Sequence, residues 1–151
     1  MKLLAYEVDK RSFLGVLNED ETWVYPVSAA GMEYRSMKDL IREAGPSEME
    51  MLDYISKKAP GDVMGAAPVD EIRVVSPIAE PDQDIICLGI NYMDHAEESA
   101  RFEKRAFEKP EKAIYFSKRV NRTNDPDGII PAHKNLTNQL DYEAELAVII
   151  K

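Results

Sequence analysis

The sequence LDYEAELAVIIK, residues 140–151, decides how the rest of the chain is interpreted. Polar and apolar residues alternate in it, which predicts a β-strand, and residues two apart in a strand face the same side. Asp141, Glu143 and Glu145 would then share one face, with the apolar residues between them facing a core. Neighbouring carboxylates on that face would lie roughly 6.6–6.8 Å apart and would repel each other.

Two situations make such a row of carboxylates tolerable. Either the face is solvated, or a cation lies between the carboxylates, and hard divalent ions such as Mg²⁺ and Mn²⁺ prefer oxygen ligands of this kind. Beyond Glu145 the same face continues as Ala147 and Ile149, so the row forms the polar end of an otherwise buried strand. The residues alone leave both a solvated face and a metal site open.

A second group of candidate residues lies in NYMDHAEES, residues 91–99. His95 and Glu98 are three residues apart, so they share one face of a helix. A carboxylate beside an imidazole can orient the ring and raise its basicity, so the pair could deprotonate a water molecule. A surface contact between the two side chains is the alternative. His133 is expected to be solvated in a loop.

Charge and composition limit the classes of partner. The net charge of −9 argues against nucleic acid, because binding phosphates requires a basic face. Residues 101–122 nevertheless hold eight basic and three acidic side chains, which could steer a small anion or could be one solvated helix face. No apolar run is long enough to cross a membrane, and the lone Cys87, expected to be buried, makes the cytoplasm the predicted compartment.

Residues 1–75 are expected to form a small N-terminal domain, a β-meander followed by two short helices. Ser36 is the expected N-cap of the first helix, and a Ser47-x-x-Glu50 capping box is expected to begin the second. The predicted strands cover 3–8, 13–18 and 22–27, and the predicted helices cover 36–45 and 47–60.

Residues 76–151 are expected to form a second domain, with the boundary between residues 60 and 80. A strand at 71–78 leads out of the first domain. The continuous apolar run at 84–91 predicts a buried strand, and 112–119 predicts another. The composition of 95–107 favours a helix.

The order and spacing of four segments resemble the fumarylacetoacetate hydrolase family. They are CLGINYMDHAEE, KAIYFSKR, IIP and LDYEAELAVII. The resemblance covers about residues 76–151, and the region before it resembles the small N-terminal domain of many bacterial members. It implies an α+β, β-rich fold, in which a small antiparallel domain precedes an incomplete mixed β-roll of the fumarylacetoacetate hydrolase type. Members generally form dimers.

The resemblance also implies a site. Glu143 and Glu145 match the family's metal ligands, with Mg²⁺ or Mn²⁺ as the usual metal and Ca²⁺ in some members. His95 and Glu98 match the dyad that activates water. Asp141 falls where members vary, and the contact made by Lys118 is left open.

The activity implied by the resemblance is metal-dependent chemistry on small anionic keto acids. Hydrolysis of a C–C bond, decarboxylation and isomerisation all pass through an enolate that the metal stabilises. The substrates are 2-oxo acids or 1,3-diketo acids such as acylpyruvates, fumarylpyruvate, 2-hydroxyhepta-2,4-diene-1,7-dioate and oxaloacetate, which fits aromatic or carboxylic acid catabolism.

The family's third metal ligand and its catalytic lysine come later than Lys151. We therefore expect the N-terminal half of a longer enzyme, inactive by itself. The alternative is a non-catalytic half-protein that acts as a binding or assembly module, in which the closing strand joins a partner.

Overall fold

The computed structural model describes residues 1–94, 97, 101 and 112–151. Two compact units make up the chain, and we describe each by itself. The first unit comprises residues 1–79 and 124–151, and the second comprises residues 80–123.

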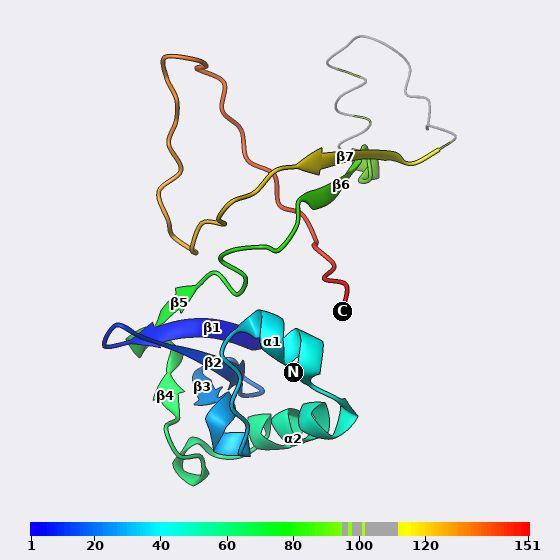
Figure 1. Cartoon of the computed structure of the whole chain (residues 1–151). Coiled ribbons are helices and arrows are strands. Elements are labelled where there is room, and N and C mark those ends of the chain that lie inside the picture. Colours follow the sequence, from blue (N-terminus) through cyan, green and yellow to red (C-terminus); the bar gives the residue numbers. More distant parts are fainter. Residues whose placement is uncertain (95–96, 98–100, 102–111) are drawn as a thin grey trace. The chain divides into compact units, whose positions relative to one another are not determined.

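A five-stranded antiparallel sheet forms the centre of the first unit (Figure 1). Its strands lie in the order β4-β3-β2-β1-β5, so β5 and β4 are the two edges. The strands are β1 (Leu3–Val8), β2 (Arg11–Leu17), β3 (Trp23–Pro26), β4 (Ala67–Pro68) and β5 (Arg73–Val75). The three predicted N-terminal strands and the predicted strand after residue 70 are therefore confirmed, the latter in a shorter form.

The hairpin between β1 and β2 has a two-residue connection. Asp9 and Lys10 both have positive φ, 49° and 64°, which matches the right-handed twist of an antiparallel pair. This turn sets a register in which Tyr6 lies opposite Phe13, and their rings stack with centroids 5.5 Å apart.

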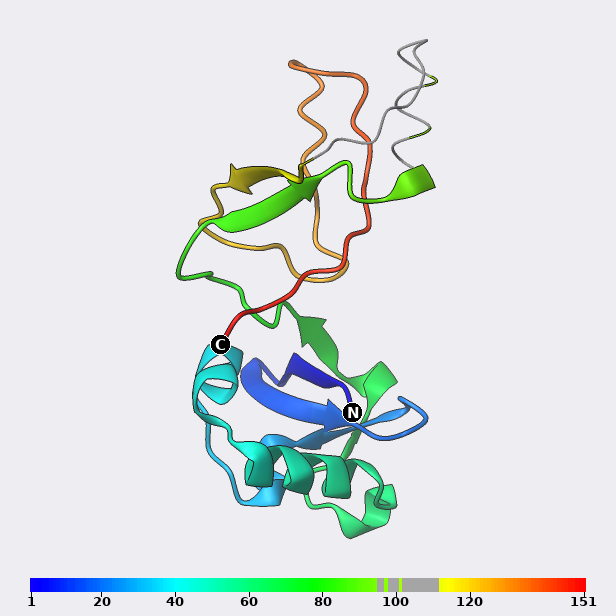
Figure 2. The same ribbon diagram turned by 90° about the vertical axis from the view of Figure 1, so that its right-hand side faces the viewer.

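Two short helices, α1 (Met37–Glu43) and α2 (Pro46–Ser56), pack against the sheet, as Figures 1 and 2 show. The 3₁₀ turns η1 (Val27–Ala30), η2 (Pro60–Asp62) and η3 (Val69–Glu71) complete the connections. Tyr25 is fully buried, and its hydroxyl donates a hydrogen bond to the Lys58 carbonyl at 2.8 Å. The other buried core residues are Val16, Val27, Met37, Leu40, Ala44, Leu52, Ile55 and Val63.

The start of α1 agrees with the sequence and the start of α2 does not. Ser36 Oγ accepts a hydrogen bond from the Asp39 N–H at 3.1 Å, as predicted. The predicted capping box at Ser47 and Glu50 is wrong, because α2 begins at Pro46 and its N-cap is Gly45, two residues before Ser47. Glu48 accepts a hydrogen bond from the Gly45 N–H at 3.1 Å in its place.

The second unit contains one antiparallel strand pair. β6 (Ile85–Gly89) lies beside β7 (Ile114–Lys118), with Cys87 opposite Phe116. Both strands are where the sequence predicts them. Cys87 is buried as expected, but the remaining residues of the pair are not buried within the analysed chain, so the prediction of a fully buried strand is wrong here.

The predicted closing strand at 140–151 is also wrong for the described structure, which assigns neither helix nor strand to residues 119–151. A strand is held by hydrogen bonds to a neighbouring strand, and no strand of the described residues pairs with this segment. An α+β, β-rich fold is confirmed, and the family-type roll stays a prediction. No helix among the described residues is long and apolar enough to span a bilayer.

Candidate functional site

The two predicted metal ligands lie in the closing segment. Glu143 and Glu145 are both exposed. Because the segment is not a strand, the argument that alternation gives them a common face does not apply to this structure. Asp141 uses its carboxylate locally, where its Oδ1 accepts a hydrogen bond from the Tyr142 N–H at 2.8 Å.

The described residues do not by themselves fit a complete metal site. Among them, no group of three His, Cys, Asp or Glu side chains lies close enough together to hold a metal ion. Two carboxylates alone would leave most positions around an octahedral Mg²⁺ to water or to other ligands. Glu143 and Glu145 would therefore need further ligands from elsewhere.

The predicted water-activating dyad, His95 and Glu98, lies outside the described residues. Of its neighbours, Asp94 and Glu97 are described as helical and exposed, and most of the helix predicted at 95–107 lies outside the described residues. The role of the dyad stays a prediction.

The described part of the basic segment is exposed and partly paired. Lys118, at the end of β7, places its Nζ 5.8 Å from the centroid of the Phe116 ring. Arg122 lies 3.7 Å from a carboxylate oxygen of Glu80. Both are surface contacts, and steering of an anionic substrate by this segment stays a prediction. His133 is exposed outside helix and strand, as predicted.

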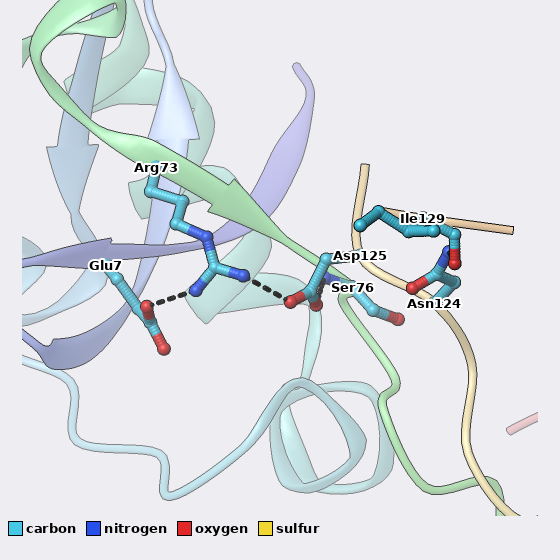
Figure 3. Close-up of polar contacts among 6 residues, drawn as sticks. All are labelled: Glu7, Arg73, Ser76, Asn124, Asp125 and Ile129. Carbon is cyan, nitrogen blue, oxygen red and sulfur yellow. Dashed lines mark hydrogen bonds and ion pairs between the residues drawn. The ribbon is translucent and has the colours of Figure 1, made fainter. Parts of the chain in front are cut away.

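A polar network in the first unit was not predicted from the sequence (Figure 3). Arg73 donates to Glu7 Oε2 and to Asp125 Oδ2, each at 2.7 Å. The other oxygen of Asp125 accepts the Ser76 N–H at 2.9 Å. The turn signal Asp-Pro-Asp-Gly at 125–128 could have marked an ordered turn, but nothing local in the sequence points to Arg73, which lies 52 residues away.

Comparison with known proteins supports the family resemblance. A family profile described as "Fumarylacetoacetate (FAA) hydrolase C-terminal" matches residues 84–151. The chain is 31% identical to "Oxaloacetate tautomerase YisK" of Bacillus subtilis (strain 168), over 99% of this chain and 52% of the relative. It is 27% identical to an uncharacterized protein, SERP0556, of Staphylococcus epidermidis, over 99% of this chain and 51% of the relative. A Staphylococcus aureus (strain USA300) protein, SAUSA300_0871, is 26% identical, with the same shares.

The profile match over residues 84–151 and the similarity to the tautomerase confirm the resemblance to the fumarylacetoacetate hydrolase family seen in the motifs. The chain spans about half the length of the curated relatives that it matches. The match to the tautomerase runs over both parts of the chain, the sheet of the first unit as well as the segments that match the family profile.

Proposed function

We propose that this chain is part of a metal-dependent enzyme that acts on small 2-oxo acids or 1,3-diketo acids. Among the reactions implied by the family, interconversion of the keto and enol forms of an oxaloacetate-like acid is the one we favour. The observation that carries this choice is the identity of 31%, over 99% of the chain, with a relative named an oxaloacetate tautomerase. C–C bond hydrolysis and decarboxylation are the other candidate reactions.

Within this proposal, Glu143 and Glu145 are two ligands of Mg²⁺ or Mn²⁺, and further ligands come from residues other than those described. A divalent cation held by these residues would supply positive charge beside the oxygens of the keto acid. His95, oriented by Glu98, takes and returns a proton. Residues 1–75 are a small N-terminal domain, residues 76–151 are the first part of the catalytic domain, and the complete protein is a homodimer.

The test uses the longest protein that the gene encodes, with oxaloacetate, an acylpyruvate and fumarylpyruvate as substrates. Keto–enol conversion and cleavage are followed by ultraviolet absorbance with and without Mg²⁺ or Mn²⁺. Glu143→Gln should abolish the metal-dependent rate, whereas Glu71→Gln, an exposed glutamate of η3, should leave it unchanged. The proposal fails if no substrate is converted, or if both variants behave alike.

A second candidate function, an assembly module, rests on the exposed strand pair of the second unit. In an antiparallel pair, residues opposite each other lie on the same face. The side chains of Cys87 and Phe116 therefore lie on one face of the strand pair, and those of Leu88 and Tyr115 lie on the other. Both faces are apolar. A two-stranded ribbon is only marginally stable in water, and a large apolar surface indicates a covering partner.

The assembly hypothesis is tested with the 151-residue chain. Ile86 and Tyr115 are 75% and 69% exposed, so replacing both by serine should reduce binding of a hydrophobic dye and any self-association seen in ultracentrifugation. Met64→Ser is the control, because Met64 is 89% exposed in the first unit, away from the strand pair in sequence. Equal effects of the two changes would speak against an assembly surface on this pair.

A further inference from the structure

The turn at residues 124–129 has a defined conformation of its own. Asp125 O accepts a hydrogen bond from the Gly128 N–H at 3.0 Å, which closes a four-residue turn with Pro126 in its second position. Asp127 has φ 60°, a left-handed conformation that Asp tolerates better than most residues. The Asn124 side chain donates to the Ile129 carbonyl at 3.3 Å. The turn therefore fixes the backbone that carries Asp125.

Asp125 binds the edge of the five-stranded sheet through both of its carboxylate oxygens. One accepts from Arg73, on the edge strand β5, and the other accepts from the Ser76 backbone N–H, just beyond the end of β5. The Asp125 side chain is 22% exposed, so much of it is covered at this contact. A carboxylate that accepts one hydrogen bond from a charged side chain and one from a backbone N–H is fixed in orientation, and its negative charge is stabilised.

Arg73 is oriented for this contact by the neighbouring strand. Arg73 of β5 and Glu7 of β1 are register partners, so their side chains lie on the same face of the sheet. Glu7 binds Nη1 and leaves Nη2 directed at Asp125 (Figure 3). The hydrogen bond and charge of Glu7, together with the charge of Asp125, hold the pKa of Arg73 above its ordinary value.

We infer that Arg73 and Asp125 form a latch that docks residues 124–129 onto the edge of the N-terminal sheet and can open without unfolding that sheet. The Arg73 side chain is 61% exposed, so water competes for it, and exposed ion pairs are individually weak. The sheet, by contrast, is held by a buried core to which none of these residues belongs. The N-terminal sheet thus acts as a docking platform for the turn at residues 124–129.

The test is residue-resolved amide exchange on the 151-residue chain, without metal or substrate, so it does not depend on the proposed activity. Asp125→Ala should speed exchange of the Ser76 N–H by about fivefold or more, which corresponds to about 1 kcal/mol. Asp125→Asn keeps an oxygen acceptor and should give a smaller increase. Arg73→Gln should also speed exchange at Ser76, although Arg73 does not itself bind that N–H.

Exchange elsewhere in the sheet, such as at the Leu17 N–H that donates to the Lys2 carbonyl at 2.9 Å, should not change in these variants. Asp53→Asn is the matched control, because it removes an exposed pair with Lys57 of 2.6 Å on α2. The latch is refuted if Ser76 exchanges at the same rate in Asp125→Ala. It is equally refuted if exchange rises throughout the sheet, since Asp125 would then be part of the fold's global stability.

Discussion

At the scale of single residues, Gly15 shows how tightly the sheet of the first unit is packed. It lies in the buried part of β2, where a Cβ would clash with Val24 Cγ2 and would come within 2.8 Å of Tyr6 Cε1. The same Cβ would lie 3.1 Å from the Tyr25 carbonyl oxygen. Val24 is fully buried and branched at Cβ, so it has little freedom to move aside.

Gly15→Ala should therefore destabilise the chain by about 1–3 kcal/mol, the usual cost of overpacking a core. The measurement is the free energy of unfolding in urea. Gly61→Ala is the control, since a Cβ there would meet nothing within 4 Å, and its effect should stay within about 0.5 kcal/mol. Similar stability of Gly15→Ala and wild type would contradict the packing described for β2.

At the scale of elements, the two helix starts show what local sequence can and cannot predict. Ser36 could be predicted as a cap because its partner, Asp39, is three residues away and no stronger signal competes. At α2 the Ser47 and Glu50 pattern was misleading, because Pro46 is favoured in the first turn of a helix and the cap lies two residues earlier, at Gly45 and Glu48. Glu48 then occupies the third position of α2, where its carboxylate can accept hydrogen bonds from the N–H groups at the start of the helix.

The cap of α2 gives a pH-dependent prediction. Hydrogen bonds from its own backbone N–H, the Ser47 hydroxyl and the Gly45 N–H lower the pKa of Glu48. A carboxylate with a lowered pKa stabilises the fold at neutral pH, and this stabilisation is lost as the pH falls through that lowered value. Glu48→Gln should therefore melt below wild type at neutral pH, and the difference should disappear in acid.

The control for this change is Glu50→Gln, which removes the residue expected from the sequence to complete the cap. Glu50 is exposed and is not the residue that faces the start of α2, so its replacement should change the melting temperature less at every pH. If Glu50→Gln lowered the melting temperature more than Glu48→Gln does, the capping box predicted from the sequence would be supported instead.

Longer-range features could be predicted only in part. The strands 3–8, 85–89 and 114–118 follow from β-branched and aromatic runs, which are local signals. The same reasoning failed for 140–151, because alternation gives a segment the potential to be a strand but not a neighbour to pair with. The contact between Arg73 and Asp125 depends on the fold and has no local signal, so the sequence could not predict it.

At the scale of the whole molecule, the chain combines one closed core with large exposed apolar areas. Within residues 1–79, a core of apolar side chains lies between a sheet and two helices. The strand pair β6–β7 and the residues from 140 onward leave many apolar side chains open, with Tyr142 and Leu146 at 90% and 85% exposure. Exposed apolar areas of this kind are typical of surfaces that bind another protein surface, which is the basis of the assembly hypothesis. The proposed metal site likewise needs more ligands than Glu143 and Glu145.

The roles proposed for the two pairs of site residues can be separated in one experiment on the longest protein that the gene encodes. A group that moves a proton contributes about 10²–10⁴-fold to a rate but does not hold the metal. His95→Ala should therefore lower turnover of the accepted keto acid by about that factor while the affinity for Mn²⁺, measured by calorimetry, stays near that of wild type. Glu145→Gln should lower both, because a carboxylate ligand is lost. If His95→Ala released the metal, His95 would be a ligand, and the division between a proton-transfer pair and a metal-binding pair would be wrong.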